Sequence, residues 1–184
     1  MALDIVILGL PGAGKGTQAK RISAETGIPH IATGDMLREA MDSETEMGVR
    51  IKPTYDAGDL VPDDLMIELI RERLSAPDTS DGFILDGFPR TAGQAVALDE
   101  LLGAGGLDRV VVFEVDEEEL VQRMLARGRA DDTEETIRHR FKVYLDQTQP
   151  LLDLYDSRGL TIRVDGVGGV EEVTERILAA LDPQ

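Results

Sequence analysis

The glycine-rich stretch from residue 9 to residue 17 is the feature that most constrains the fold of this chain of 184 residues. It reads Gly-Leu-Pro-Gly-Ala-Gly-Lys-Gly-Thr and follows an apolar run, residues 3–8, that contains β-branched side chains. A buried strand that runs into glycines lets the backbone turn tightly and brings several N–H groups around one point. A helix that begins after the glycines directs the positive end of its dipole to the same point. The stretch therefore predicts a phosphate-binding loop between a strand and a helix.

The spacing of this loop matches the P-loop pattern with one variation. Gly9, Gly14 and Lys15 have the expected spacing, but Gly16 follows the lysine and Thr17 comes one place later. The lysine would be a mobile cation for the outer phosphates, and the threonine hydroxyl would lie near the phosphates and their magnesium ion. The alternative is a plain Gly/Pro turn after a core strand. The strand before the loop and the helical pattern after it favour the phosphate site.

The composition indicates one acidic globular domain. Hydrophobic residues make up 42% of the chain and aromatic residues only 4%, so the core is expected to be mainly aliphatic. The formal net charge of −17 disfavours general binding to a nucleic-acid backbone. A phosphate site must then be a local cluster of cations. The acidic excess indicates either adaptation to salt or ordinary solvated helix faces.

Cysteine is absent from the chain, which excludes disulfides and thiolate zinc sites and fits a reducing compartment. No apolar run reaches the roughly eighteen residues of a membrane span. The first residues lack the pattern of a signal peptide. We therefore expect a cytoplasmic protein with no nucleic-acid or membrane partner and no bound zinc.

Apolar runs and helical patterns alternate along the chain. The expected strands cover residues 3–8, 28–32, 83–86, 110–115 and 161–165. This alternation predicts an α/β fold with a five-stranded parallel sheet and helices on both faces. In such a sheet, binding sites lie at the carboxyl ends of the strands.

Two prolines are expected to disturb helices. A helical pattern covers residues 45–57, with Pro53 as a break or kink. A longer pattern runs from Thr133 towards Tyr155, with a bend at Pro150. The first of these would form a small helical excursion from the main body.

Asp86 and a group of arginines are further candidates for phosphate chemistry. Asp86 ends an expected strand, where a carboxylate would meet a phosphate-bound magnesium ion through water; its other possible role is a cap or a loop hydrogen bond. Clustered guanidinium groups are unfavourable unless an anion or local acids neutralise them. Arg138 is expected to be only a surface partner. The arginine group comprises Arg90, Arg123, Arg127, Arg129, Arg138 and Arg140.

Four segments together resemble a known family. They are residues 9–18, Thr33-Gly-Asp-Met-Leu-Arg38, Asp86-Gly-Phe-Pro-Arg90 and Gly128-Arg-Ala-Asp-Asp132. Their order and spacing resemble the adenylate kinase family, in its bacterial short-lid form, among the nucleoside monophosphate kinases. The resemblance covers essentially the whole chain.

The family resemblance implies a single P-loop domain with three layers, a small helical segment for the nucleoside monophosphate and a short lid. The core would comprise residues 1–32, 62–127 and 137–184. The monophosphate-binding segment would be residues 33–61, and the lid residues 128–136.

The resemblance also implies an activity. The expected reaction is the reversible, magnesium-dependent transfer of the terminal phosphoryl group of ATP to AMP, giving two ADP molecules. The AMP phosphate oxygen is already anionic at neutral pH, so catalysis would come from alignment and from surrounding cations rather than from a general base. Mg²⁺ bound with ATP would be the cofactor, and the protein would act as a monomer. Rival functions are a kinase for UMP or CMP, a nucleotide-binding regulator and a P-loop ATPase that acts on a partner.

Matching positions give the expected site residues. The catalytic residues would be Lys15, Arg90, Arg123, Arg129 and Arg140. The ATP site would comprise Gly12, Ala13, Gly14, Lys15, Gly16, Thr17, Arg123, Arg127 and Gly168. The AMP site would comprise Thr33, Arg38, Asp59, Leu60, Val61, Gly87, Phe88, Pro89, Arg90, Gln94, Arg129 and Arg140. Asp86 would hold the magnesium ion through water.

Thr33 and Gln94 favour adenine as the acceptor base. The resemblance implies alanine and asparagine at these positions in relatives that act on UMP or CMP. A glutamine amide can both donate to and accept from the edge of adenine. Gly168 would offer only backbone contacts to the base of ATP.

Overall fold

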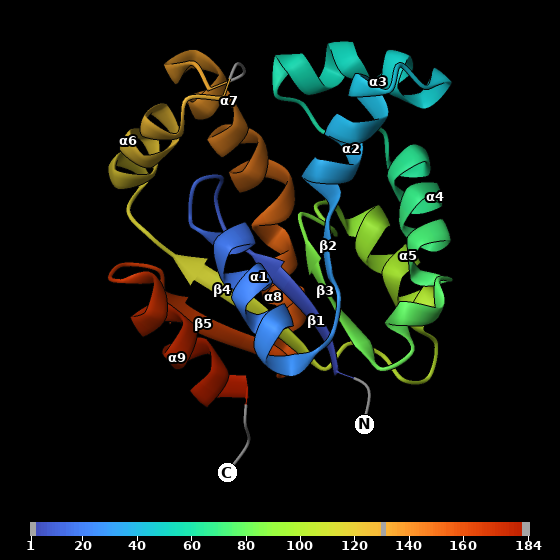
Figure 1. The fold of residues 1–184 in the computed structure, drawn as a ribbon, viewed down its shortest axis with the longest axis vertical. Helices are drawn as coiled ribbons and strands as arrows, with labels where there is room; N and C mark the ends of the chain where they lie inside the picture. Colours follow the sequence, from blue (N-terminus) through green and yellow to red (C-terminus); the bar gives the residue numbers. More distant parts are fainter. Residues whose placement is uncertain (1–2, 130–131, 182–184) are drawn as a thin grey trace.

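The computed structural model describes residues 3–129 and 132–181. Within these ranges, five strands form one parallel sheet in the order β2-β3-β1-β4-β5 (Figure 1). The strands are β1 (Leu3–Leu8), β2 (His30–Ala32), β3 (Gly82–Asp86), β4 (Arg109–Glu114) and β5 (Thr161–Asp165). The predicted α/β class and the five-stranded parallel sheet are confirmed.

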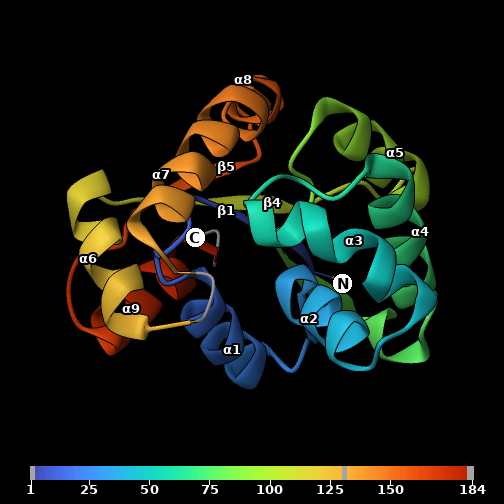
Figure 2. The same cartoon turned by 90° about the horizontal axis from the view of Figure 1, so that it is seen from above.

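Helices connect the strands and cover both faces of the sheet (Figures 1 and 2). The first half of the chain contains α1 (Lys15–Thr26), α2 (Thr33–Asp42), α3 (Glu46–Ala57), α4 (Asp63–Leu74) and the short 3₁₀-helix η1 (Pro77–Thr79). The second half contains α5 (Ala92–Leu102), α6 (Glu117–Arg127), α7 (Glu134–Val143), the π-helix η2 (Tyr144–Thr148), α8 (Pro150–Ser157) and α9 (Val170–Leu181).

The apolar run of β1 supplies both halves of the core because alternate side chains of a strand face opposite sides of the sheet. Ile5 and Ile7 pack with residues of α1, α6, α7 and α9. Val6 and Leu8 pack with residues of α4, α5 and α8. All four side chains are almost completely buried. A continuous apolar run is therefore what a central parallel strand requires.

The register of the central strands places polar groups at one edge. Asp86 at the end of β3 lies level with Ile7 of β1 and Ala32 of β2. The glycine-rich loop follows β1 directly. In Figure 1 this carboxyl edge is the upper edge of the sheet, and the two marked chain ends lie below it. The α2–α3 pair and the α6–α7 pair rise on opposite sides of this edge.

Helix α3 runs without interruption through Pro53, so the predicted break is absent. Pro53 lies in the second half of this helix and removes one backbone hydrogen-bond donor from it. Ile51 is 1% exposed and fixes the helix on the core, while Thr45 Oγ1 caps the start by accepting the Gly48 N–H at 3.0 Å. Packing and capping thus outweigh the loss of one donor.

The predicted long helix with a bend at Pro150 is instead interrupted before that proline. Helix α7 ends at Val143, a π-helical turn follows, and Pro150 is the first residue of α8. The Gln149 N–H donates to the Tyr144 carbonyl at 2.9 Å, a bond that spans five residues. Proline suits a first helical position because its missing N–H would have no partner there.

Gly48 allows α3 to cross α2 closely, which gives a stability prediction. A Cβ atom at this position would lie 2.0 Å from the Ala40 carbonyl oxygen, a backbone atom that cannot swing away. We expect Gly48→Ala to lower the free energy of unfolding by about 1–3 kcal/mol, measured by urea denaturation. The control is Gly105→Ala, where the nearest atom would be an ordinary 3.7 Å away. Equal stability of the two variants would contradict this packing.

Candidate active site

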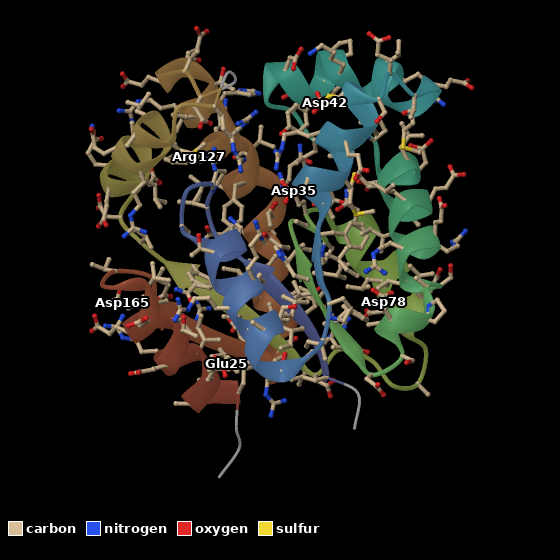
Figure 3. The ribbon with its side chains drawn as sticks, in the orientation of Figure 1. Glu25, Asp35, Asp42, Asp78, Arg127 and Asp165 are labelled. Atoms are coloured by element: carbon tan, nitrogen blue, oxygen red, sulfur yellow. The ribbon has the colours of Figure 1, made fainter. Side chains whose placement is uncertain are left out.

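A cavity of about 460 Å³ lies at the carboxyl edge of the sheet, between the glycine-rich loop, the α2–α3 pair and the α6–α7 pair. Arg127 and Asp35, both of which line it, are labelled on facing sides in Figure 3. Of the predicted site residues, those that line the cavity are Gly12, Gly14, Lys15, Gly16, Thr17, Thr33, Arg38, Asp59, Leu60, Val61, Asp86, Gly87, Arg90, Gln94, Arg123, Arg127, Arg129 and Arg140. Among the described residues, Ala13, Phe88, Pro89 and Gly168 were also predicted but do not line it.

The glycine-rich loop adopts a conformation that larger residues resist. Gly12 has φ +87° and Gly14 has φ +90°, both in the left-handed region. A Cβ atom on Gly12 would lie 2.8 Å from Met124 Cγ on α6. Helix α1 begins at Lys15, directly after these glycines. The loop thus places the positive end of α1 against the cavity, as an anion site requires.

Lys15 is folded back onto this loop. Its Nζ donates to the carbonyl oxygens of Gly9 at 2.7 Å and Leu10 at 2.9 Å. Burial lowers the pKa of Lys15 to about 8; the charge of Asp86 opposes this shift, and the charges of Arg90 and Arg127 add to it. An incoming anion would therefore stabilise the charged form of this lysine.

The Asp86 carboxylate lies beside this loop. Its Oδ2 lies 3.3 Å from His30 Nε2 and 3.3 Å from the position of a Cβ on Gly16. Burial alone would raise the pKa of Asp86, but the hydrogen bond with His30 and the charges of Lys15 and Arg90 outweigh it and hold the pKa below its usual value. The carboxylate is thus ionised at neutral pH and lines the cavity.

Acidic side chains pair with the arginines of α6 and α7, and one of these acids contacts two arginines. Arg127 donates through Nε and Nη2 to the two carboxylate oxygens of Asp132, at 2.9 and 2.8 Å. Arg140 Nη1 lies 3.7 Å from the same carboxylate, whose side chain is fully buried. Arg123 pairs with Glu119. Local acids therefore hold these guanidinium groups, and the groups still line one cavity.

Arg90 approaches the cavity from the loop after β3. Its Nε donates to the Gly87 carbonyl at 2.8 Å. Burial lowers the pKa of Arg90, and the charge of Arg140 adds to the effect. Arg129 has a lowered pKa too, from burial and then from Arg127. By contrast, Arg138 pairs with surface acids of α6 and α7, as expected.

Tyr55 is a site residue that the sequence did not reveal. Arg38 Nη1 donates to its hydroxyl at 2.6 Å, and the guanidinium carbon of Arg140 lies 5.8 Å from the centre of its ring. The tyrosine thus joins one arginine of the α2–α3 pair to one of α7. The available signal was the scarcity of tyrosine, three residues in the chain, with one inside the helical excursion.

The π-helix contributes two more residues that the sequence did not reveal. Thr148 Oγ1 donates to the Arg90 carbonyl at 2.9 Å. Tyr144 lines the cavity together with Gly9, and burial raises its pKa to about 12. One turn of wide helix therefore lines the cavity with the glycine-rich loop and contacts the Arg90 loop, a placement common for π-helical turns at functional sites.

Residues 166–169, which follow β5, do not line the cavity, but the Gly166 carbonyl accepts from Arg123, which does. Gly168 has φ +122°, and a Cβ there would lie 2.6 Å from Glu172 Oε2. Asp165 Oδ1 accepts the Val167 N–H at 2.9 Å, and Arg176 Nη1 donates to the Val167 carbonyl at 2.8 Å. This loop is well held by its own contacts, and glycine suits its backbone at position 168.

The residues that form this cavity match a known protein family. The family model described as adenylate kinase matches residues 7–160, which includes the whole cavity. The chain belongs to the adenylate kinase family.

Relatives that carry the name adenylate kinase match over nearly the full chain. The protein of Nocardia farcinica is 52% identical over 181 residues, covering 97% of this chain and 99% of its own. The protein of Kocuria rhizophila is 50% identical over 184 residues, covering 97% and 98%. The protein of Stenotrophomonas maltophilia is 50% identical over 185 residues, covering 97% and 99%.

The described residues of this adenylate kinase family member contain neither a ready-made metal cluster nor a helix that could span a membrane. In residues 3–129 and 132–181, no group of three or more histidine, cysteine or acidic side chains has a geometry that would hold a metal ion. None of the helices in the same ranges has the length and apolarity that crossing a membrane requires.

The lowered pKa of Lys15 predicts that this residue destabilises the ligand-free protein. Its pKa falls from 10.5 to about 8 on folding, so between these values the unfolded chain binds more protons than the folded protein. The free energy of unfolding then gains a contribution as pH rises through this window. We expect Lys15→Met to be more stable than the parent near pH 7, with the difference shrinking as the pH approaches 10.5.

Urea unfolding of both proteins across this pH range provides the measurement. Added tripolyphosphate is the control, because a polyanion should raise the stability of the parent more than that of Lys15→Met. A variant that is less stable than the parent at neutral pH would show that the lysine is well accommodated without an anion.

Proposed function

We propose that the chain catalyses the reversible transfer of the terminal phosphoryl group of ATP to AMP, giving two ADP molecules. The observation that carries this proposal is that one cavity is lined both by a glycine-rich loop and by arginines from three helices and two loops. Family membership and the names of the relatives agree with it.

The proposed ATP site lies over the glycine-rich loop. Backbone N–H groups of residues 12–17 and the start of α1 would hold the phosphates, with Lys15 at the outer ones. Arg127 would lie over the nucleotide, and Gly168 would meet the base through its backbone from outside the cavity. Ala13 would contribute its backbone alone, because its side chain is buried.

The proposed AMP site lies between the α2–α3 pair and the loop after β3. Thr33, Arg38 and residues 59–61 line one side. Residues 87–90 and Gln94 would form the other side. Phe88 is fully buried and Pro89 does not line the cavity, so these two would shape the loop rather than touch the nucleotide.

The donor set fits a magnesium ion that arrives with ATP. Mg²⁺ keeps several waters and is usually bound by one or two carboxylates plus substrate phosphates. Asp86 is ionised and lines the cavity next to the glycine-rich loop, and the Thr17 hydroxyl lies in the same lining. These two residues would hold the ion, Asp86 through water. Bound Mg²⁺ would neutralise charge that develops on the phosphoryl oxygens.

The protein's own part in catalysis would be to align the two substrates and to surround the transferring phosphoryl group with positive charge. Arg90, Arg123, Arg129 and Arg140 would surround the transferring phosphoryl group, and each planar guanidinium can reach two oxygens at once. Fixed cations in a site with little water stabilise the transition state without reorganisation. Excluding water also prevents simple hydrolysis of ATP.

Two segments are proposed to close over the substrates. They are the monophosphate-binding segment 33–61 and the short lid 128–136, on a core of residues 1–32, 62–127 and 137–184. Residues 130–131 of the lid lie outside the described part of the chain. His139 of α7 lies 2.6 Å from Asp59 Oδ1, and this contact supports the idea that segment 33–61 closes onto α7. Reopening of these segments would then limit turnover.

We further propose that the protein acts as a cytoplasmic monomer without nucleic-acid or membrane partners. The net charge of −17 supports the absence of nucleic acid, since phosphate backbones would be repelled. The substrates ATP, AMP and ADP would be the main partners of the protein.

An acceptor panel tests the proposed function. The chain is incubated with ATP, Mg²⁺ and one of AMP, CMP, UMP or GMP, and the nucleoside diphosphates are measured. We expect rapid formation of two ADP per AMP and much slower use of the other acceptors. Phosphate release from ATP without AMP would favour an ATPase, and binding of both nucleotides without transfer would favour a regulator.

Removing a single arginine from the cavity should lower kcat/KM for phosphoryl transfer. We expect Arg90→Ala and Arg129→Ala each to lose roughly 2–4 kcal/mol of transition-state stabilisation in kcat/KM. The matched control is Arg73→Ala, because Arg73 pairs with Asp78 and does not line the cavity. Near-normal turnover in either of the first two variants would remove those residues from the proposed roles.

A further inference from the structure

The amide of Gln94 is held in one orientation by two hydrogen bonds. The residue is 2% exposed and lines the cavity. Its Nε2 donates to Asp63 Oδ1 at 2.8 Å, and its Oε1 accepts the Arg90 backbone N–H at 2.7 Å. Buried amides with two such partners have little freedom to rotate.

The chemistry of the two partners decides which end of the amide donates. An ionised carboxylate only accepts hydrogen bonds, and a backbone N–H only donates them. If the amide turned over, its oxygen would face the Asp63 carboxylate and its N–H groups would face the Arg90 N–H. Both contacts would become repulsive. Asp63, at the start of α4, thus fixes the polarity of a side chain on α5.

The position of Asp63 is itself tightly defined. Thr91 Oγ1 donates to Asp63 Oδ2 at 2.7 Å, and the same hydroxyl caps α5 by accepting the Gln94 N–H at 3.1 Å. A Cβ on Gly93 would lie 2.8 Å from Asp63 Oδ2, so glycine leaves the room that the carboxylate occupies. Helices α4 and α5 lie side by side (Figures 1 and 2). The start of α5 also favours an anion at this point.

These contacts leave one N–H and one oxygen lone pair of the amide for a base. Adenine presents an amino donor beside a ring-nitrogen acceptor on its outer edge. Hypoxanthine presents the reverse, a carbonyl acceptor beside an N–H donor. An amide with fixed polarity can therefore match one of these edges and must oppose the other.

We propose that Asp63 is a positioning residue that sets the acceptor selectivity of the enzyme, by holding the Gln94 amide in the polarity that suits a 6-aminopurine and rejects a 6-oxopurine. The inference rests on the proposed function, in which AMP is the acceptor and Gln94 faces its base. Asp63 touches neither substrate in this proposal and acts through Gln94.

Two variants loosen the amide by different routes. Asp63→Ala removes the acceptor. Gly93→Ala changes no hydrogen-bonding group but displaces the carboxylate by steric contact, and alanine favours the helix more than glycine does. The matched control is Asp64→Ala, which removes an exposed acid from the same first turn of α4.

The measurement is kcat/KM with ATP and Mg²⁺ for AMP and for IMP, whose base is hypoxanthine. We expect the ratio of AMP to IMP to fall by about tenfold or more in Asp63→Ala and Gly93→Ala, and to stay at the parent value in Asp64→Ala. The KM for AMP should rise more than kcat falls, because ground-state positioning is lost. A purely structural defect would lower both acceptors together and leave the ratio unchanged.

The outcomes separate this inference from the proposed function. A parent protein that makes no ADP from ATP and AMP would overturn the function itself. An active parent whose AMP-to-IMP ratio is the same in Asp63→Ala, Gly93→Ala and Asp64→Ala would overturn the role of Asp63 alone. If Asp63→Ala does not fold, Gly93→Ala decides the question, because a normal ratio in that variant contradicts the proposal.

Discussion

The cavity at the carboxyl edge of the sheet brings several cations close enough to repel one another. Lys15, Arg90, Arg127 and Arg140 come from four different elements and share this cavity. Burial lowers the pKa of Lys15 and of Arg90, and neighbouring arginines add to the effect while Asp86 opposes it. A rigid parallel sheet holds them there, because loops and helix ends that follow adjacent strands must meet at one edge.

Acidic side chains and backbone carbonyl oxygens contact these cations, and a bound anion could take their place. Asp132 bridges Arg127 and Arg140, Glu119 pairs with Arg123, and carbonyl oxygens of the glycine-rich loop hold the Lys15 ammonium. Among the described residues, eight lysine and arginine side chains line the cavity against three aspartates, so this lining stays cationic even with Asp132 and Glu119 counted against it. The rest of the chain is strongly acidic, with a net charge of −17. Two polyanionic substrates would therefore find one favourable place on a repelling surface.

Neighbours in sequence made much of the fold and site predictable. About ten neighbouring residues are enough to predict the glycine-rich loop, the apolar strands and the place of Asp86 at a strand end. The arginine group was recognisable because like charges at helical spacing need a counter-charge. The family resemblance then supplied the assignment of individual residues to the two nucleotide sites, which remains a proposal.

Contacts across the fold could not be predicted in the same way. The π-helical turn arises from a change of register that leaves no clear periodicity, so the roles of Tyr144 and Thr148 were missed. Pro53 was expected to break or kink α3, but the helix continues through it and packs against the core. The residues around Asp63 in the sequence give no sign of its bond to Gln94, which exists only because α4 and α5 pack together. In each case, a partner distant in sequence decides the role.

The most direct test of this account is a crystal structure of the protein with two adenosines joined by a chain of five phosphates. We expect the phosphate chain to span the cavity, with oxygens within hydrogen-bonding distance of Lys15 Nζ and of the guanidinium groups of Arg90 and Arg129. We also expect Lys15 to leave the carbonyl oxygens that it now contacts. A complex in which the phosphates lie elsewhere, or in which those cations point into bulk solvent, would show that this cavity is not the site of phosphoryl transfer.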